Sequence, residues 1–322
     1  MQQLESYYLP VSEDLRKVED RLVSLADVDA PWLSSPLRYI LDGGGKQFRA
    51  GMTLLAGKLY KYNLDSLIPM ATAVELLHTA SLVHDDAVDG SDMRRGKSAV
   101  HTIWGRSTAV LVGDYLFANA AELVSRTGNV IVMKLFANTL MTMANSELGE
   151  STSLFDLSQS REQYYRRIGG KTASLFSMAT ESGATLSDAP QEAVDALKDY
   201  GYNVGLAFQI IDDILDFTAQ ESELGKPVGA DLRHGILTLP AILLLEHYPK
   251  NNPIKQIFEN KDPKSNIQRV VDMIHNSPVI NECYEVACDF CTKACDSLKI
   301  LPDSSAKESL RQLTERAIRR RQ

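Results

Sequence analysis

Apolar residues recur at helical spacing along almost the whole chain. Near the N-terminus they repeat every three or four residues, at Val11, Leu15, Val18, Leu22 and Leu25, which is the pattern of an amphipathic helix. The alternation of apolar and polar residues that marks a half-buried strand is almost absent. The pattern predicts an all-α protein, with shorter helices after residue 235. Long helices are expected at 46–60, 67–89, 107–127, 130–152, 161–182 and 191–218.

Glycine, proline and polar clusters separate these stretches, and no repeat or low-complexity linker interrupts the chain. The breaks fall at residues 43–45, 187–190, 225–227 and 261–263. A chain of 322 residues that is 44% apolar can bury a large core. We therefore expect one helical domain over residues 1–322.

Two acidic motifs share the spacing Asp-Asp-x-x-Asp inside otherwise apolar helices. The first aspartate motif is Asp85–Asp89 and the second is Asp212–Asp216. Residues four apart lie on one face of a helix, so the outer aspartates of each motif point the same way. Grouped carboxylates repel unless a cation joins them, and open oxygen-only sites shared with phosphate suit Mg²⁺. One motif alone could be a solvated helix end, but two identical motifs favour about three divalent ions beside a diphosphate.

Basic and polar residues near these motifs are candidates for binding the diphosphate. Adjacent arginines follow the first motif, and a glycine-rich turn precedes a lysine and an arginine. One guanidinium group can bind two phosphate oxygens, and glycine permits close approach of the backbone to an anion. A lone helical histidine is more often a core residue, but His78 lies seven residues before Asp85 on the same helical stripe, which favours substrate contact. Each of the others, taken alone, could be a surface or cap residue. The candidates are Lys46, Arg49, His78, Arg94, Arg95, Lys171, Thr172, Gln209 and Lys226.

With these residues assembled, the chain resembles the trans-prenyltransferase family, the head-to-tail isoprenyl diphosphate synthases. The resemblance extends from Gly43 to about Leu245 and less distinctly to the C-terminus. It implies an isoprenoid synthase-type helical bundle around a central cavity, a homodimer and a Mg²⁺-dependent prenyltransferase. The motifs that carry it are Gly44–Arg49, Leu77–Asp89, Asp92–Gly96, Gly113–Leu116, Gly170–Thr172 and Phe208–Asp216.

The resemblance also implies a role for each candidate residue. Metal ions would be held by Asp85, Asp89 and Asp212, with Asp86, Asp213 and Asp216 in support. The allylic diphosphate would contact Arg94, Lys171, Gln209 and Lys226. Isopentenyl diphosphate would contact Lys46, Arg49, His78 and Arg95. The oxygen dipoles of Thr172 and Gln209 would face the allylic cation. The chain departs from the family pattern at Gln47, Ala50 and Ile236, which removes possible donors to diphosphate.

The implied reaction is the departure of diphosphate from the allylic substrate, attack by the isopentenyl double bond and loss of a proton. Stabilisation of the charge on the departing diphosphate and orientation of the two substrates account for the rate of this reaction, so no protein nucleophile is needed. Ala80 and Ser81 precede Asp85 by five and four residues, roughly 6 to 8 Å along the helix, where the growing chain would pass. Both are small, which favours a medium- or long-chain product, unless they serve only close helix packing. A short-chain farnesyl or geranylgeranyl diphosphate synthase is the alternative.

Two further alternatives remain. A class I terpene cyclase has a similar first motif, but its second motif usually mixes Asn, Ser and Glu at wider spacing. A non-catalytic subunit of a heteromeric synthase typically loses motif aspartates, whereas all six are present.

Composition limits the location and partners. The net charge of −8 and pI near 5.4 argue against nucleic acid as a partner. Residues 1–10 lack a basic and apolar signal pattern, and the most apolar stretch, Ile236–Leu245, is too short to span a membrane. We therefore expect no transmembrane segment and a cytoplasmic protein.

The four cysteines all fall between Cys283 and Cys295. Their spacing superficially resembles that of an iron–sulfur or zinc site. The segment nevertheless has the pattern of a continuous helix without the turns that wrap a metal, so we interpret the cysteines as small packing residues in a reducing compartment.

Overall fold

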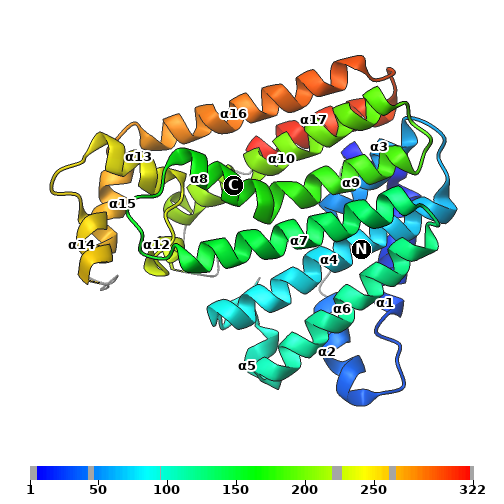
Figure 1. Ribbon diagram of the computed structural model, residues 1–322, viewed down its shortest axis with the longest axis horizontal. Coiled ribbons are helices and arrows are strands. Elements are labelled where there is room, and N and C mark those ends of the chain that lie inside the picture. The colour runs from blue at the N-terminus through cyan, green and yellow to red at the C-terminus, as the bar shows by residue number, and fades with distance from the viewer. Residues whose placement is uncertain (1–5, 43–46, 95, 220–226, 261–265, 320–322) are drawn as a thin grey trace. The chain divides into compact units, whose positions relative to one another are not determined.

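The computed structural model describes residues 6–42, 47–94, 96–219, 227–260 and 266–319 (Figure 1). The chain forms two compact units, each assembled from segments far apart in the sequence. The first comprises residues 1–138, 175–201 and 297–313, and the second comprises 139–174, 202–296 and 314–322. Helices α7, α10 and α17 contribute residues to both units. The expectation of a single domain stays a prediction.

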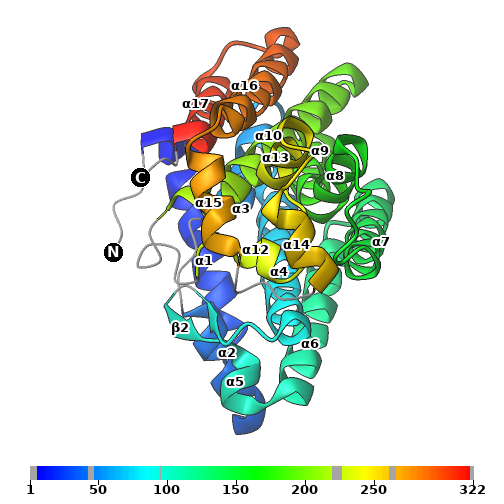
Figure 2. The ribbon, with the colours of Figure 1, turned by 90° about the vertical axis from the view of Figure 1, so that its left-hand side faces the viewer.

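Within the described residues, the regular elements of the first unit are helices and one short hairpin. In the hairpin, Met93 pairs with Ser98, and the Tyr39 hydroxyl donates to the Ser98 carbonyl at 2.7 Å. Figure 2 shows this hairpin close to α2 and α5. The elements that belong wholly or partly to this unit are η1 (Ser6–Val11), α1 (Ser12–Ser24), α2 (Pro31–Leu41), α3 (Phe48–Lys58), α4 (Leu64–Asp89), β1 (Met93–Arg94), β2 (Lys97–Ser98), α5 (Val100–Trp104), α6 (Arg106–Arg126), α7 (Val130–Thr152), α9 (Ser174–Thr185), α10 (Gln191–Thr218), η3 (Leu298–Ile300) and α17 (Ser305–Arg319).

Helix α4 is the central element of the first unit, and it packs along α3 and α6. The Asn63 side chain caps its first turn by accepting from the Asp65 backbone N–H at 3.1 Å, and it ends at Gly90, whose φ of 67° is left-handed. A Cβ on Gly113 of α6 would collide with the His84 ring, so glycine permits the close approach of these two helices. Helix α4 is long and apolar enough to cross a membrane, but 78% of its most apolar window is buried within the protein, as in a core helix.

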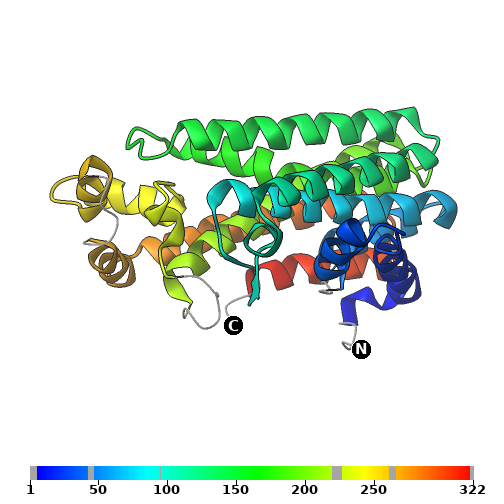
Figure 3. The ribbon, with the colours of Figure 1, turned by 90° about the horizontal axis from the view of Figure 1, so that it is seen from below.

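The second unit packs short helices against the C-terminal half of α10. Its core contains Ile210, Ile214 and Phe217 of α10 together with Leu243 of α13. Figure 3 shows the yellow and orange helices α13, α14 and α15 grouped together. The remaining elements of this unit are α8 (Arg161–Ile168), the π-helical turn η2 (Gly169–Ala173), α12 (Ala230–Arg233), α13 (Leu239–His247), α14 (Pro253–Asn260), α15 (Ile267–His275) and α16 (Val279–Ser297).

Helical spacing predicted most of these elements. The expected helices at 130–152 and 191–218 match α7 and α10 at both ends, and the N-terminal amphipathic pattern forms α1. The single helix expected over 161–182 is wrong, because the π-helical turn divides it into α8 and α9. Helix α2 was not expected; it buries only Pro36 and Leu37, too few positions to give a periodic pattern.

The cysteine segment forms the continuous helix α16, as expected. Cys283 and Cys291 are buried, and burial raises the pKa of the Cys291 thiol to about 12. Its sulfur lies 3.8 Å from the Thr314 carbonyl. The packing interpretation fits these two residues but is wrong for Cys288, which is exposed.

Candidate active site

The first aspartate motif lies at the C-terminal end of α4, and its three carboxylates have different surroundings. Asp85 is half-buried and Asp89 is exposed, whereas Asp86 is only 5% exposed. The Arg94 Nε lies 2.7 Å from both Asp86 oxygens. Burial raises the pKa of Asp86, and the Arg94 guanidinium opposes that rise. Arg94 therefore neutralises a buried carboxylate, and the expected contact of Arg94 with diphosphate requires it to share or leave Asp86.

A stripe of partly exposed residues leads down α4 from Asp85. His78, Ser81 and Leu82 lie on it, as their spacing of three and four residues requires. The Ser81 hydroxyl donates to the His78 carbonyl at 2.8 Å. Ala80 is fully buried, at 0% exposure, because five residues from Asp85 is more than a third of a turn away from that stripe. The structure thus places Ser81, and not Ala80, on the side of α4 that carries Asp85.

Arg49 begins the first turns of α3, beside aromatic residues of α9. It is buried, and its guanidinium carbon lies 4.3 Å from the centre of the Phe176 ring. Phe48 packs edge-on against the same ring. The Ala50 backbone N–H donates to the buried Glu75 carboxylate at 2.9 Å. These contacts fix the start of α3. The expected partners Lys46 and Arg95 lie outside the described residues.

The second aspartate motif lies near the end of α10, and two of its members are deeply buried. Asp213 accepts from the Tyr164 hydroxyl at 2.6 Å and from the Gln209 amide at 2.9 Å. Burial, reinforced by the nearby Asp231 carboxylate, raises the pKa of Asp213 to about 8, although both hydrogen bonds oppose the rise. Asp216 accepts from the Asp231 backbone N–H at 3.3 Å. Asp212 is only half-buried, so it is the accessible carboxylate of this motif.

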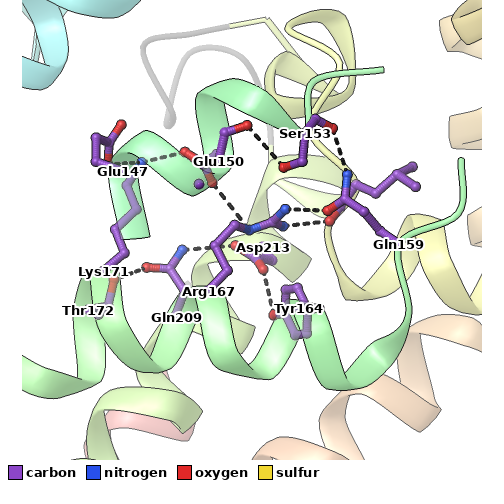
Figure 4. Close-up of polar contacts among 12 residues, drawn as sticks. Glu147, Glu150, Ser153, Gln159, Tyr164, Arg167, Lys171, Thr172, Gln209 and Asp213 are labelled. Atoms are coloured by element: carbon purple, nitrogen blue, oxygen red, sulfur yellow. Dashed lines mark hydrogen bonds and ion pairs between the residues drawn. The ribbon is translucent and has the colours of Figure 1, made fainter. Parts of the chain in front are cut away.

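The π-helical turn brings Lys171 and Thr172 to this motif. Cβ atoms on Gly169 and Gly170 would collide with the hydroxyls of Tyr202 and Ser146, so the two glycines let the widened turn pass close to its neighbours. The Thr172 hydroxyl donates to the Gln209 carbonyl oxygen at 2.7 Å. Thr172, Gln209 and Asp213 thus form one hydrogen-bonded chain (Figure 4). The sequence analysis singled out all three, and the structure brings them together.

Several charged residues of this region were not predicted. Figure 4 shows Glu147 and Glu150 beside Lys171, and Arg167 beside Glu150. The Lys171 ammonium lies 2.8 Å from a Glu147 oxygen and 2.6 Å from a Glu150 oxygen. The only sequence signal for this grouping is the spacing of three between the two glutamates on α7. Lys226, expected as a further donor, lies outside the described residues.

Each aspartate motif, taken by itself, offers oxygen donors that suit an open metal site. Asp85, Asp89 and Asp212, the three expected ligands, are the accessible members of the two motifs. Among the described residues, no three His, Cys, Asp or Glu side chains are gathered closely enough to enclose a metal ion. Hard divalent cations that keep water and phosphate ligands need no such enclosure.

An all-helical fold with two such aspartate motifs defines the isoprenyl diphosphate synthase class, and comparison with known proteins agrees. The family model described as polyprenyl synthetase matches residues 30–274. The chain therefore belongs to the polyprenyl synthetase family and is a prenyltransferase.

Individual relatives cover nearly the whole chain. A solanesyl-diphosphate synthase 2, chloroplastic, from Oryza sativa subsp. japonica is 34% identical over 96% of this chain and 78% of its own length. The crystal structure of heptaprenyl diphosphate synthase from Staphylococcus aureus is 34% identical with a TM-score of 0.92, covering 98% of this chain and 100% of its own. A polyprenyl synthase from Caulobacter crescentus complexed with calcium and isoprenyl diphosphate is 33% identical with a TM-score of 0.92 and full coverage of both chains.

Proposed function

We propose that the protein condenses isopentenyl diphosphate head-to-tail with an allylic diphosphate to make a medium- or long-chain trans-polyprenyl diphosphate. The observation that carries the proposal is the difference in burial among the carboxylates of the two aspartate motifs. Asp86 and Asp213 are buried, whereas Asp85, Asp89 and Asp212 are accessible to solvent. Accessible carboxylates can be reached by cations that accompany a diphosphate.

Asp85, Asp89 and Asp212 are the residues we assign to Mg²⁺, about three ions per active site. When bound, these ions would supply the positive charge that stabilises the departing diphosphate. The Caulobacter crescentus relative, solved with calcium and isoprenyl diphosphate, supports a divalent cation in this role.

Thr172 and Gln209 are oriented for stabilising a carbocation. The Gln209 amide donates to Asp213, so its carbonyl oxygen must be the atom that accepts from Thr172. The Thr172 hydroxyl uses its proton in this bond, which leaves its oxygen lone pairs for the allylic cation. Preorganised oxygen dipoles at a developing charge need no reorganisation during the reaction. The released diphosphate is the base that we assign to the last proton.

The second diphosphate is assigned to Arg49 and His78, with Lys46 and Arg95. The Phe176 ring, whose centre lies 4.3 Å from the Arg49 guanidinium carbon, restrains the guanidinium group, and a guanidinium recognises a phosphate by paired N–H donors. His78 lies on the same stripe of α4 as Asp85.

The assignment of product length rests on Ser81 and on the relatives. Ser81 is a small residue on the Asp85 side of α4. Relatives named as solanesyl and heptaprenyl synthases support a product longer than those of the farnesyl and geranylgeranyl enzymes.

We also propose a homodimer. Helix α6 exposes Val110 and Leu111, and helix α7 exposes Ile131, Met141 and Leu148. Exposed apolar residues of this kind are typical of interaction surfaces. A single dimer mass in analytical ultracentrifugation, lost on Leu111→Glu, is the expected result. Cytoplasmic location stays a prediction of the sequence, which cell fractionation tests.

One incubation tests the central proposal. Purified protein, Mg²⁺, radiolabelled isopentenyl diphosphate and an allylic starter should give diphosphates longer than the starter, resolved by chromatography after dephosphorylation. A terpene cyclase would release cyclic hydrocarbon from the starter, and a non-catalytic subunit would leave both substrates unchanged. Either result contradicts the proposal.

A further inference from the structure

Four charged side chains of the second unit form a network around Lys171. Glu150 contributes one oxygen to the Lys171 ammonium at 2.6 Å and the other to the Arg167 Nε at 3.2 Å. Glu147 contributes an oxygen to the same ammonium at 2.8 Å. Lys171 therefore has two carboxylate partners, although its expected ligand is a diphosphate.

The two glutamates differ in how firmly they are held. Glu150 and Arg167 have side chains only 11% and 8% exposed. Arg167 also donates to the Gln159 side chain at 2.7 Å and to the Leu237 carbonyl at 2.6 Å. Glu150 thus lies between two cations, one of which is anchored to neighbouring loops, and losing its charge would leave a buried guanidinium without that partner.

Glu147 is the loosely held member. Its side chain is 29% exposed and that of Lys171 is 30% exposed. A partly exposed ion pair of this kind contributes little to stability, so another anion can displace it. A diphosphate that approaches Lys171 has to compete with Glu147, and Glu147 returns as the second carboxylate partner of Lys171 when the diphosphate leaves.

We propose that Glu147 is an exchangeable counter-ion for Lys171 that weakens diphosphate binding and favours its release, and that Glu150 is a positioning residue that keeps Lys171 in place during the exchange. This rests on the proposed function and on the contact between Lys171 and the allylic diphosphate that the family resemblance implies. The two glutamates, three residues apart on one helix, should then have opposite effects when neutralised.

The test measures binding of inorganic pyrophosphate to the full-length protein in Mg²⁺ by titration calorimetry. Glu147→Gln should tighten binding about two- to fivefold, because it removes the competing charge and keeps the side-chain shape. Glu150→Gln should weaken binding, because Lys171 and Arg167 lose their common anchor. In steady-state assays, the Michaelis constant for the allylic diphosphate should fall for Glu147→Gln and rise for Glu150→Gln.

Two further variants make the result specific. Glu162→Gln removes one negative charge from an exposed ion pair with Arg166 on α8 and should leave pyrophosphate affinity unchanged. In a Lys171→Met background, Glu147→Gln should lose its effect, because the charge that it competes for is absent. Unchanged or weaker binding by Glu147→Gln, or tightening that persists in Lys171→Met, would overturn the counter-ion proposal.

The Lys171→Met variant distinguishes a failure of the proposed function from a failure of the counter-ion proposal. Loss of pyrophosphate binding on Lys171→Met, together with chain elongation by the wild type, supports the premise. If Lys171→Met binds pyrophosphate as the wild type does, the assignment of Lys171 is wrong, whatever the glutamate variants do.

Discussion

The buried carboxyl of Asp213 should make the stability of the metal-free protein fall as the pH rises. In the folded protein its pKa is raised from 3.8 to about 8, chiefly by burial. Between these two values the folded state binds a proton that the unfolded state has released. The contribution of this carboxyl to the free energy of unfolding is therefore fully present below about pH 4 and is lost progressively up to about pH 8.

The magnitude follows from proton linkage. One proton difference changes the free energy of unfolding by about 1.4 kcal/mol per pH unit. From pH 5 to pH 7, Asp213 should thus remove roughly 3 kcal/mol of stability, since the pKa of about 8 already includes its hydrogen bonds to Tyr164 and Gln209. The Asp213→Asn variant cannot ionise and retains the shape of the side chain, so this loss should be absent from it.

Urea unfolding in EDTA, followed by circular dichroism at pH 5, 6 and 7, measures the effect. Asp195→Asn, at an exposed position on the same helix, is the matched control and should follow the wild type. If the wild type and Asp213→Asn lose stability in parallel over this range, Asp213 does not carry the raised pKa, and the argument from burial is refuted.

Three further predictions concern turnover and product. Asp85→Ala and Asp212→Ala should each lower turnover by several orders of magnitude with little change in melting temperature, because charge stabilisation of the leaving group is lost; near-normal rates in Mg²⁺ would contradict the metal assignment. Arg49→Lys should raise the Michaelis constant for isopentenyl diphosphate about tenfold and that for the allylic substrate much less, since the lysine keeps the charge but loses the paired donors; equal shifts would refute the assignment. Ser81→Phe should shorten the product, measured by chain-length chromatography, whereas Ala80→Phe should chiefly destabilise the fold by overpacking; an unchanged product from a folded Ser81→Phe would exclude Ser81 as the gate.

The sequence predicted the helices and the chemical character of the site because both depend on local spacing. Helical periodicity located α7 and α10, and the aspartate spacing placed Asp85 and Asp89 on one face. The family resemblance implied that Thr172 and Gln209, two residues far apart in the sequence, both face the allylic cation, but it did not predict the hydrogen bond between them.

The partners of the charged residues were not predictable in the same way. The pairing of Lys171 with Glu147 and Glu150 joins segments more than 20 residues apart and depends on the π-helical turn. A helical repeat of 3.6 residues carries no signal for that turn, although the Gly169–Gly170 pair marks a place of close backbone approach. The Arg94–Asp86 ion pair likewise depends on the left-handed turn at Gly90 and the short hairpin that follows.

The two aspartate motifs are identical in spacing but unequal in structure, and the difference lies at their last residue. Helix α4 ends at Asp89, which is exposed, whereas α10 continues to Thr218 and Asp216 is only 1% exposed. The Asp231 backbone N–H bonds to the Asp216 carboxylate, which ties α12 to the end of the motif. Only the first motif therefore has two accessible carboxylates.

Neutralising the last aspartate should consequently have different effects in the two motifs. Asp89→Asn should lower turnover while changing the free energy of unfolding by no more than about 0.5 kcal/mol, as expected for an exposed residue. Asp216→Asn should destabilise the protein by about 1–3 kcal/mol, because it replaces a buried, hydrogen-bonded carboxylate. Urea unfolding and steady-state turnover, measured on both variants, separate the two effects. Equal destabilisation by the two substitutions would show that burial does not distinguish Asp89 from Asp216, and the assignment of Asp85, Asp89 and Asp212 as the metal-binding set would lose its structural basis.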